Sequence, residues 1–290
     1  MGTPAWTATS GRDAFDRADV VTTAPERSRW TAIVVGATSA VGVAAVYLLL
    51  VGTAAGQRFD QDVFAAATSA QDGGSVPGVL RLDVMTNPLL WICVTAVVLV
   101  FGSAVRRPLA VAVALAVPVL SVVAARALRL GVLDRPQLDP DAPWPMANTF
   151  PSGHVAGAMG VALGLVLIAP GWMRLLGLVP CAVWVTLVSR DIMGAGWHRL
   201  SDVAGSVLLA TAVAGLGAAL VAADGRRMEL SARLVAVVGT PVATVVVAGV
   251  LDPRPLGVLT VVLAVGVSVP MAVFVSATRA VAPGSPPPPT

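Results

Sequence analysis

Long apolar runs alternate with short polar connections along most of the chain. A helix needs about 20 residues to cross a hydrocarbon core of about 30 Å, and eight runs approach or reach this length. They cover approximately residues 31–51, 86–105, 108–126, 154–170, 173–189, 202–222, 233–250 and 256–277. Prolines occur inside some of the runs, and helices in lipid tolerate proline better than soluble helices do. The pattern therefore predicts an all-α fold, a polytopic transmembrane helix bundle.

Both ends of the chain lack this pattern. Residues 1–29 are polar, carry charges of both signs and show no apolar period, which predicts a disordered tail. Residues 278–290 are rich in proline and predict a second disordered tail.

The composition is that of a membrane protein. Hydrophobic residues make up 56% of the chain and charged residues 12%, against about 45–50% and about 25% in ordinary globular domains. These values exclude a soluble enzyme and an extended disordered chain. The chain has only two cysteines, Cys93 and Cys181, and both lie in apolar runs, which excludes a disulfide scaffold.

The basic residues indicate an orientation in the membrane. All nineteen are arginines, and they form no patch despite a net charge of +3, so no nucleic-acid partner is expected. Cytoplasmic connections carry the excess of positive charge in membrane proteins. We therefore expect a multi-pass plasma-membrane protein with both termini in the cytoplasm. The arginines on its inner side are Arg106, Arg107, Arg174, Arg226, Arg227, Arg233 and Arg279.

Two outer segments carry arginines against this bias. Residues 127–153 contain Arg129 and Arg135, and residues 190–201 contain Arg190 and Arg199. A positive charge placed against the topological bias needs another reason. The same two segments lead to the only two histidines of the chain, so the sequence predicts a functional site on the extracytoplasmic face.

The two histidines stand where helices are expected to begin. His154 ends the tetrapeptide Pro-Ser-Gly-His at residues 151–154, and His198 is followed four residues later by Asp202. Helix N-termini present free N–H groups and a partial positive charge, and arginine matches the oxygens of phosphate. Two such helix starts that converge beside arginines would bind a phosphate group.

The histidines can divide phosphate-ester cleavage between them. His198, oriented by the carboxylate of Asp202, would attack phosphorus, and His154 would donate a proton to the leaving oxygen. Further groups would stabilise the charge of the transferring phosphoryl group. These groups are Arg135, Arg129, Ser152, Gly153 and Arg190.

These residues resemble the signature of the type-2 phosphatidic acid phosphatase superfamily of integral membrane lipid phosphatases. That signature consists of Lys, six residues, Arg-Pro, then Pro-Ser-Gly-His, then Ser-Arg, five residues, His, three residues and Asp. The second part is complete at residues 151–154. The third is present as Ser189-Arg190, His198 and Asp202, and the first is partial, as Arg129 followed by Arg135-Pro136.

The chain departs from the signature at two points. Leu128 occupies the position of the lysine, whose role passes to Arg129 or Arg126 or is lost. Seven residues instead of five separate Arg190 from His198, so either Arg190 or Arg199 supplies the charge of the third part.

The resemblance covers roughly residues 86–222. It implies a six-span phosphatase core over residues 30–222, and two additional transmembrane helices then occupy residues 223–277. It also implies a metal-independent lipid phosphatase that hydrolyses a phosphomonoester or diphosphate, of the polyprenyl diphosphate or phosphatidic acid type, through a phosphohistidine. No cofactor is expected, and the partners are the lipid substrate and the bilayer.

Other functions fit the residues less well. Two histidines and one aspartate are too few for a two-metal centre, and the arginines would repel a cation. A lipid-linked phosphotransferase would share the covalent intermediate and differ only in the acceptor. An eight-span carrier of an anionic solute would place ionisable groups at mid-membrane, where the sequence has none. A non-catalytic scaffold would leave both histidines unexplained.

Overall fold

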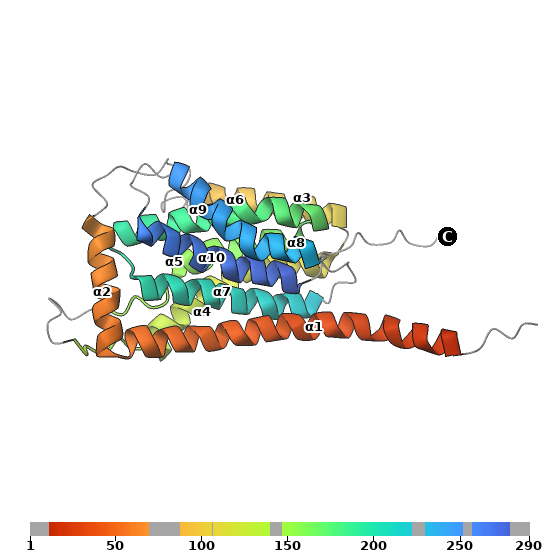
Figure 1. The fold of residues 1–290 in the computed structure, drawn as a ribbon, viewed down its shortest axis with the longest axis horizontal. Coiled ribbons are helices and arrows are strands. Elements are labelled where there is room, and N and C mark those ends of the chain that lie inside the picture. Colours follow the sequence, from red (N-terminus) through yellow and green to blue (C-terminus); the bar gives the residue numbers. More distant parts are fainter. Residues whose placement is uncertain are drawn as a thin grey trace, which may run out of the picture.

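The computed structural model describes residues 12–69, 88–105, 107–139, 147–221, 230–251 and 257–278, and these residues form helices and connections without strands. Most of the helices lie along one common direction (Figure 1). In chain order they are α1 (Arg12–Val46), the π-helix η1 (Tyr47–Val51), α2 (Ala54–Ser69), α3 (Pro88–Val105), α4 (Pro108–Ala127), the π-helix η5 (Leu128–Val132), α5 (Gly153–Ile168), α6 (Gly171–Gly194), α7 (Leu200–Val221), α8 (Leu230–Leu234), the π-helix η6 (Val235–Gly239), α9 (Thr240–Leu251) and α10 (Val258–Ala277).

Each of the eight apolar runs of the sequence coincides with a helix, so the all-α prediction is confirmed for the described residues. Six of the described helical segments are long and apolar enough to cross a membrane: Ser28–Val51, Pro108–Val132, Gly171–Gly194, Leu200–Val221, Ala232–Leu251 and Val258–Ala277. The helix Gly153–Ile168 is apolar but shorter, with 16 residues. These helices fit a multi-pass membrane protein, and the count of eight spans stays a prediction.

Two segments outside the apolar runs are helical. Residues 12–29, assigned to a disordered tail, form the first part of α1. Once the apolar run has formed a helix, each added residue gains a hydrogen bond without a new nucleation step, so the helix extends into polar sequence. Residues 54–69, between the first and second apolar runs, form α2. Residues 1–11 and 279–290 of the two tails lie outside the described residues.

Helix α7 is the centre of the bundle, and it packs against α1, α4, α5 and α10. Small residues allow the close approach of these helices, as is usual for helix packing in membranes. A Cβ atom on Gly215 of α7 would stand 2.7 Å from the backbone nitrogen of Gly36 in α1. A Cβ atom on Gly164 of α5 would stand 2.5 Å from the carbonyl oxygen of Ala114 in α4.

A buried arginine joins the C-terminal helix α10 to this bundle. Arg174, near the start of α6, is 1% exposed. Its Nε donates to the carbonyl of Val166 in α5 at 3.1 Å, its Nη1 to the carbonyl of Thr278 at 3.1 Å, and its Nη2 to the hydroxyl of Thr278 at 2.5 Å. The sequence predicted Arg174 in an inner connection. It contacts the C-terminal part of α5, whereas His154 stands at the N-terminal start of that helix. Its charge is satisfied by helix ends rather than by solvent.

Helix α2 lies across one end of the bundle, roughly perpendicular to the other helices (Figure 1). The residues that it buries, Gly56, Gln57, Asp60 and Ala67, recur at helical spacing and therefore share one face. That face packs against α6 and α7 at the end of the molecule where α1 finishes and α7 begins. A polar helix face thus covers the end of the bundle that holds the candidate site.

The close approach of α4 and α5 makes a stability prediction. Replacement of Gly164 by alanine puts a methyl group against a carbonyl oxygen of α4, and we expect a loss of about 1–3 kcal/mol of stability from this overpacking. Gly177→Ala in α6 is the matched control, because its Cβ atom would meet nothing within 4 Å. Thermal unfolding of both variants in detergent measures the difference, and equal stabilities would contradict the packing described.

Candidate active site

The end of α6 positions His198. The N–H of Gly196 donates to the carbonyl of Met193 at 3.0 Å, and the N–H of Trp197 donates to the carbonyl of Ile192 at 3.1 Å. This pair of bonds is a Schellman motif, which requires a left-handed residue after the helix, and Gly196 has a φ of 75°. The chain therefore turns sharply after α6 and brings His198 to the start of α7.

The start of α5 positions His154. Ser152 is the N-cap of α5, and its Oγ accepts a hydrogen bond from the N–H of Val155 at 3.4 Å. The N–H of Ser152 donates to the carbonyl of Asp202 at 3.3 Å, and the hydroxyl of Ser206 donates to the carbonyl of Ser152 at 2.8 Å. The starts of α5 and α7 are thus tied together.

Asp202 gathers several donors on one carboxylate oxygen, and it is fully buried. Its Oδ2 lies 3.2 Å from Nδ1 of His198 and accepts from the hydroxyl of Thr149 at 2.6 Å. The same oxygen accepts from the N–H of Arg199 at 2.9 Å. Because Asp202 stands at the third position of α7, this last bond is one half of a capping box. The carboxylate orients the imidazole and caps the helix at once.

The two histidines lie together. Their ring centroids are 6.3 Å apart with the planes steeply inclined, although 43 sequence positions separate His154 from His198. Since Nδ1 of His198 faces Asp202, its Nε2 is the nitrogen left for chemistry. The half-exposed Trp197 packs beside His154, with ring centroids 6.0 Å apart. The histidine pair predicted from the sequence is present in the fold.

Arg135 lies between two buried carboxylates. Its Nη2 is 3.1 Å from Oδ2 of Asp60 and 3.6 Å from Oδ1 of Asp202, and it donates to the hydroxyl of Ser201 at 2.9 Å. The side chain is only 1% exposed. Arg135 therefore reaches the histidine site through Asp202, at the carboxylate oxygen that does not contact His198. Sequence reasoning had placed it directly on the phosphate.

Asp60 is the other carboxylate of this cluster. Burial raises the pKa of the Asp60 carboxyl, and the nearby charge of Asp202 acts in the same direction. Hydrogen bonds from the hydroxyl and the N–H of Ser201, together with the charge of Arg135, lower that pKa and oppose the effect of burial. The ionisation of the Asp60 carboxyl therefore depends on Ser201 and Arg135.

Two arginines flank the histidine pair. Arg129 is half-buried in the π-helix η5, close enough to His154 for the two charges to interact, whereas Arg126 is exposed. Such π-turns are frequent at functional sites. Arg199 lies with its guanidinium carbon 5.1 Å from the ring centroid of Phe64, and its Nε is 3.4 Å from Oε1 of Gln61.

Arg190 points to a different element. It is 5% exposed, and its Nη1 donates to the hydroxyl of Thr260 near the start of α10. Arg190, one of the two candidates for the charge of the third motif, is therefore held by α10, which lies outside the predicted six-span core.

Helix α2 supplies residues that sequence reasoning missed. Asp60 contacts Arg135, while Gln61 and Phe64 contact Arg199. Gln57 donates to the carbonyl of Pro136 at 2.5 Å and accepts from the N–H of Leu138 at 3.2 Å, which fixes the connection that carries Arg135. The signal available was the recurrence of Gly56, Gln57, Asp60, Phe64 and Ala67 at helical spacing, which marks one face of a helix.

Within the described part of the chain, no group of three or more His, Cys, Asp and Glu side chains is placed to hold a metal ion. The cation beside the two carboxylates is the guanidinium of Arg135. The donor set therefore suits an anion bound at the histidines.

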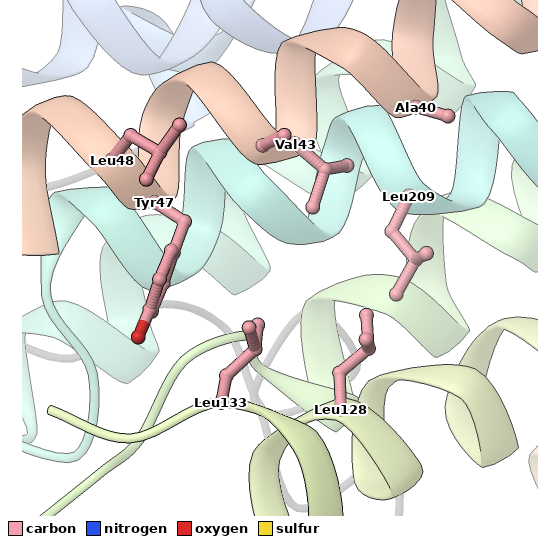
Figure 2. A pocket seen from close by; sticks show the side chains of 8 residues that line it. Ala40, Val43, Tyr47, Leu48, Leu128, Leu133 and Leu209 are labelled. Atoms are coloured by element: carbon pink, nitrogen blue, oxygen red, sulfur yellow. The ribbon is translucent and has the colours of Figure 1, made fainter. Parts of the chain in front are cut away.

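An apolar groove opens beside the site, between α1, η5 and α7. It has a volume of about 360 Å³ and is lined by Ala40, Val43, Ala44, Tyr47, Leu48, Leu128, Leu133 and Leu209. Figure 2 shows Val43, Tyr47 and Leu209 directed toward Leu128 and Leu133. The hydroxyl of Tyr47 donates to the carbonyl of Asp134 at 2.7 Å, next to Arg135. One end of the groove thus adjoins the segment that carries Arg129 and Arg135.

Comparison with known proteins gives one match. A family model described as the PAP2 superfamily matches residues 109–226, a segment that contains both histidines and Asp202. No curated protein and no solved structure matches the chain. The match confirms the resemblance that the motifs indicate. Residues 109–226 thus match the PAP2 superfamily, whose members are phosphatases or related phosphoesterases.

Proposed function

We propose that the protein is a membrane phosphatase that removes phosphate from a lipid phosphomonoester or diphosphate through a phosphohistidine on His198. The observation that carries the proposal is the pairing of the two histidines, with ring centroids 6.3 Å apart and Asp202 on Nδ1 of His198. That arrangement provides a nucleophile and a proton donor for one phosphoryl group.

The reaction has two steps. In the first, Nε2 of His198 forms a bond to phosphorus, the bond from phosphorus to the leaving oxygen breaks, and His154 gives that oxygen a proton. In the second, His154 takes a proton from water as the water oxygen attacks phosphorus and the P–N bond breaks. Asp202 stabilises the positive charge that His198 acquires at its hydrogen-bonded Nδ1.

Positive charge and helix starts stabilise the transferring group. Arg129 lies beside His154, and Arg199 follows His198 directly. Gly153 begins α5 in open space, where its N–H can meet an anion at the helix N-terminus. Three further residues support the site indirectly. The side chain of Ser152 caps α5, Arg135 pairs with Asp202, and Arg190 bonds to Thr260.

A lipid substrate is favoured by the surroundings of the site. The groove between α1, η5 and α7 is lined by apolar side chains and lies next to the segment of Arg129 and Arg135. A hydrocarbon chain in this groove would leave its phosphate near the histidines. Polyprenyl diphosphates and phosphatidic acid both combine such a chain with a terminal phosphate.

The active site is proposed to face the extracytoplasmic side. His154, His198 and α2 lie at one end of the bundle, and Arg107 and Arg174 stand at the helix starts of the opposite end. Positive charge is enriched at cytoplasmic helix ends, which supports an inner location for that opposite end.

Phosphate release tests the proposal directly. Purified protein in detergent is expected to release phosphate from a short-chain phosphatidic acid in the presence of a chelator, and vanadate is expected to inhibit it. His198→Ala removes the nucleophile, so turnover should fall on the order of 10³-fold or more. Dependence of the wild-type activity on a metal ion, or full activity in His198→Ala, would refute the mechanism. Phosphorylation of an added acceptor instead of water would identify a phosphotransferase.

The role of His154 makes a second prediction. A general acid matters only when the leaving oxygen is basic, so His154→Ala should lower turnover of an alkyl phosphate about 10²-fold to 10⁴-fold. The same variant should still form the phosphohistidine from p-nitrophenyl phosphate, whose leaving group departs without a proton, at a rate much closer to that of the wild type, as measured by the burst of p-nitrophenol before steady turnover. His198→Ala is the control and should lose both the turnover and the burst. An equal loss of alkyl phosphate turnover and of the burst rate in His154→Ala would exclude the assignment.

A further inference from the structure

The start of α7 lacks an N-cap side chain that can accept hydrogen bonds. The helix begins at Leu200, so the N-cap position belongs to Arg199, whose side chain has no acceptor for the free N–H groups of the first turn. An uncapped N-terminus in a buried setting is costly, and Ser201 is fully buried. Some other group must accept these hydrogen bonds.

That group is a carboxylate from α2. Oδ1 of Asp60 accepts the N–H of Ser201 at 2.9 Å, and Oδ2 accepts the hydroxyl of Ser201 at 2.6 Å. Asp60 is fully buried and stands 141 positions earlier in the chain than Ser201. A negative charge at this place also stabilises the positive end of the α7 dipole.

The same carboxylate lies closer to Arg135 than Asp202 does. Nη2 of Arg135 is 3.1 Å from Oδ2 of Asp60 but 3.6 Å from Oδ1 of Asp202. The charge of Arg135 is thus shared by the two acids. Without the charge of Asp60, Arg135 would interact more strongly with Asp202 and would compete with His198 for that carboxylate.

We propose that Asp60 is a positioning residue that caps α7 and holds Arg135, so that Asp202 stays aligned with Nδ1 of His198. The consequence for catalysis rests on the proposed role of His198. Asp60 lies outside the segment that matches the PAP2 superfamily. Helix α2 therefore takes part in building the catalytic end of the protein.

Asp60→Asn tests the proposal without the need for enzyme activity. Asparagine keeps the size of the side chain and one acceptor oxygen, but it loses the charge and replaces the other oxygen by an NH2 group that can only donate. Diethylpyrocarbonate modifies neutral imidazole, and mass spectrometry of the His198 peptide against pH gives the titration midpoint of His198. The charged groups around His198 are Asp202 on α7, His154 on α5, Arg135 and Arg199 in the connections, and Asp60 on α2.

Loss of the negative charge leaves more positive charge near His198, so its midpoint should shift to lower pH by about half to one pH unit. Asp62→Asn is the matched control, because Asp62 is on the same helix but exposed. In this variant, the titration midpoint of His198 should equal that of the wild type. An unmoved midpoint in Asp60→Asn would overturn the proposal. Ser201→Ala should shift the midpoint in the same direction and replaces Asp60→Asn if that variant does not fold.

Activity separates this inference from the proposed function. With short-chain phosphatidic acid as the probe, Asp60→Asn should lower kcat about tenfold to a hundredfold and leave KM within about twofold, because Asp60 orients the nucleophile and touches no substrate. A wild-type protein that releases no phosphate would refute the proposed function, while the His198 midpoint still decides the role of Asp60. A wild-type kcat in a folded Asp60→Asn would refute the inference alone.

Discussion

The first turn of α7 is the point on which the candidate active site depends. Asp202 there accepts hydrogen bonds from Thr149 and from the N–H of Arg199, and it orients His198. A helix start is suited to this task because its N–H groups and dipole stabilise a buried negative charge. Two carboxylates and one guanidinium share the site, so each charge is buried with a partner, as buried charges must be.

The elements outside the family segment hold the parts of the site in place. Helix α2 fixes the connection that carries Arg135, and it packs Phe64 beside Arg199. Helix α10 is bound to α6 by two arginine–threonine pairs, Arg190 with Thr260 at the catalytic end and Arg174 with Thr278 at the other. The additional C-terminal helix is therefore part of the same packed unit as the catalytic helices. Helices that cannot slide along one another keep the histidines at a fixed separation.

Sequence reasoning recovered what local signals encode. Apolar runs predicted the helices, and helix-start signals placed His154, His198 and Asp202 at one end, where the structure brings them together. The contacts that it missed link distant segments, such as Asp60 with Ser201, and no local pattern announces them. Helix α2 was not predicted, because its buried face is partly polar and the search relied on apolar runs. The placement of Arg135 against two carboxylates required the fold itself.

The central claim is that the two imidazoles act on one phosphoryl group. The most direct measurement is an experimental structure of the protein with vanadate, which adopts the geometry of phosphoryl transfer. The account predicts vanadium bonded to Nε2 of His198, with the ring of His154 against the oxygen on the opposite side. Vanadate bound elsewhere, or in contact with only one of the two rings, would contradict it.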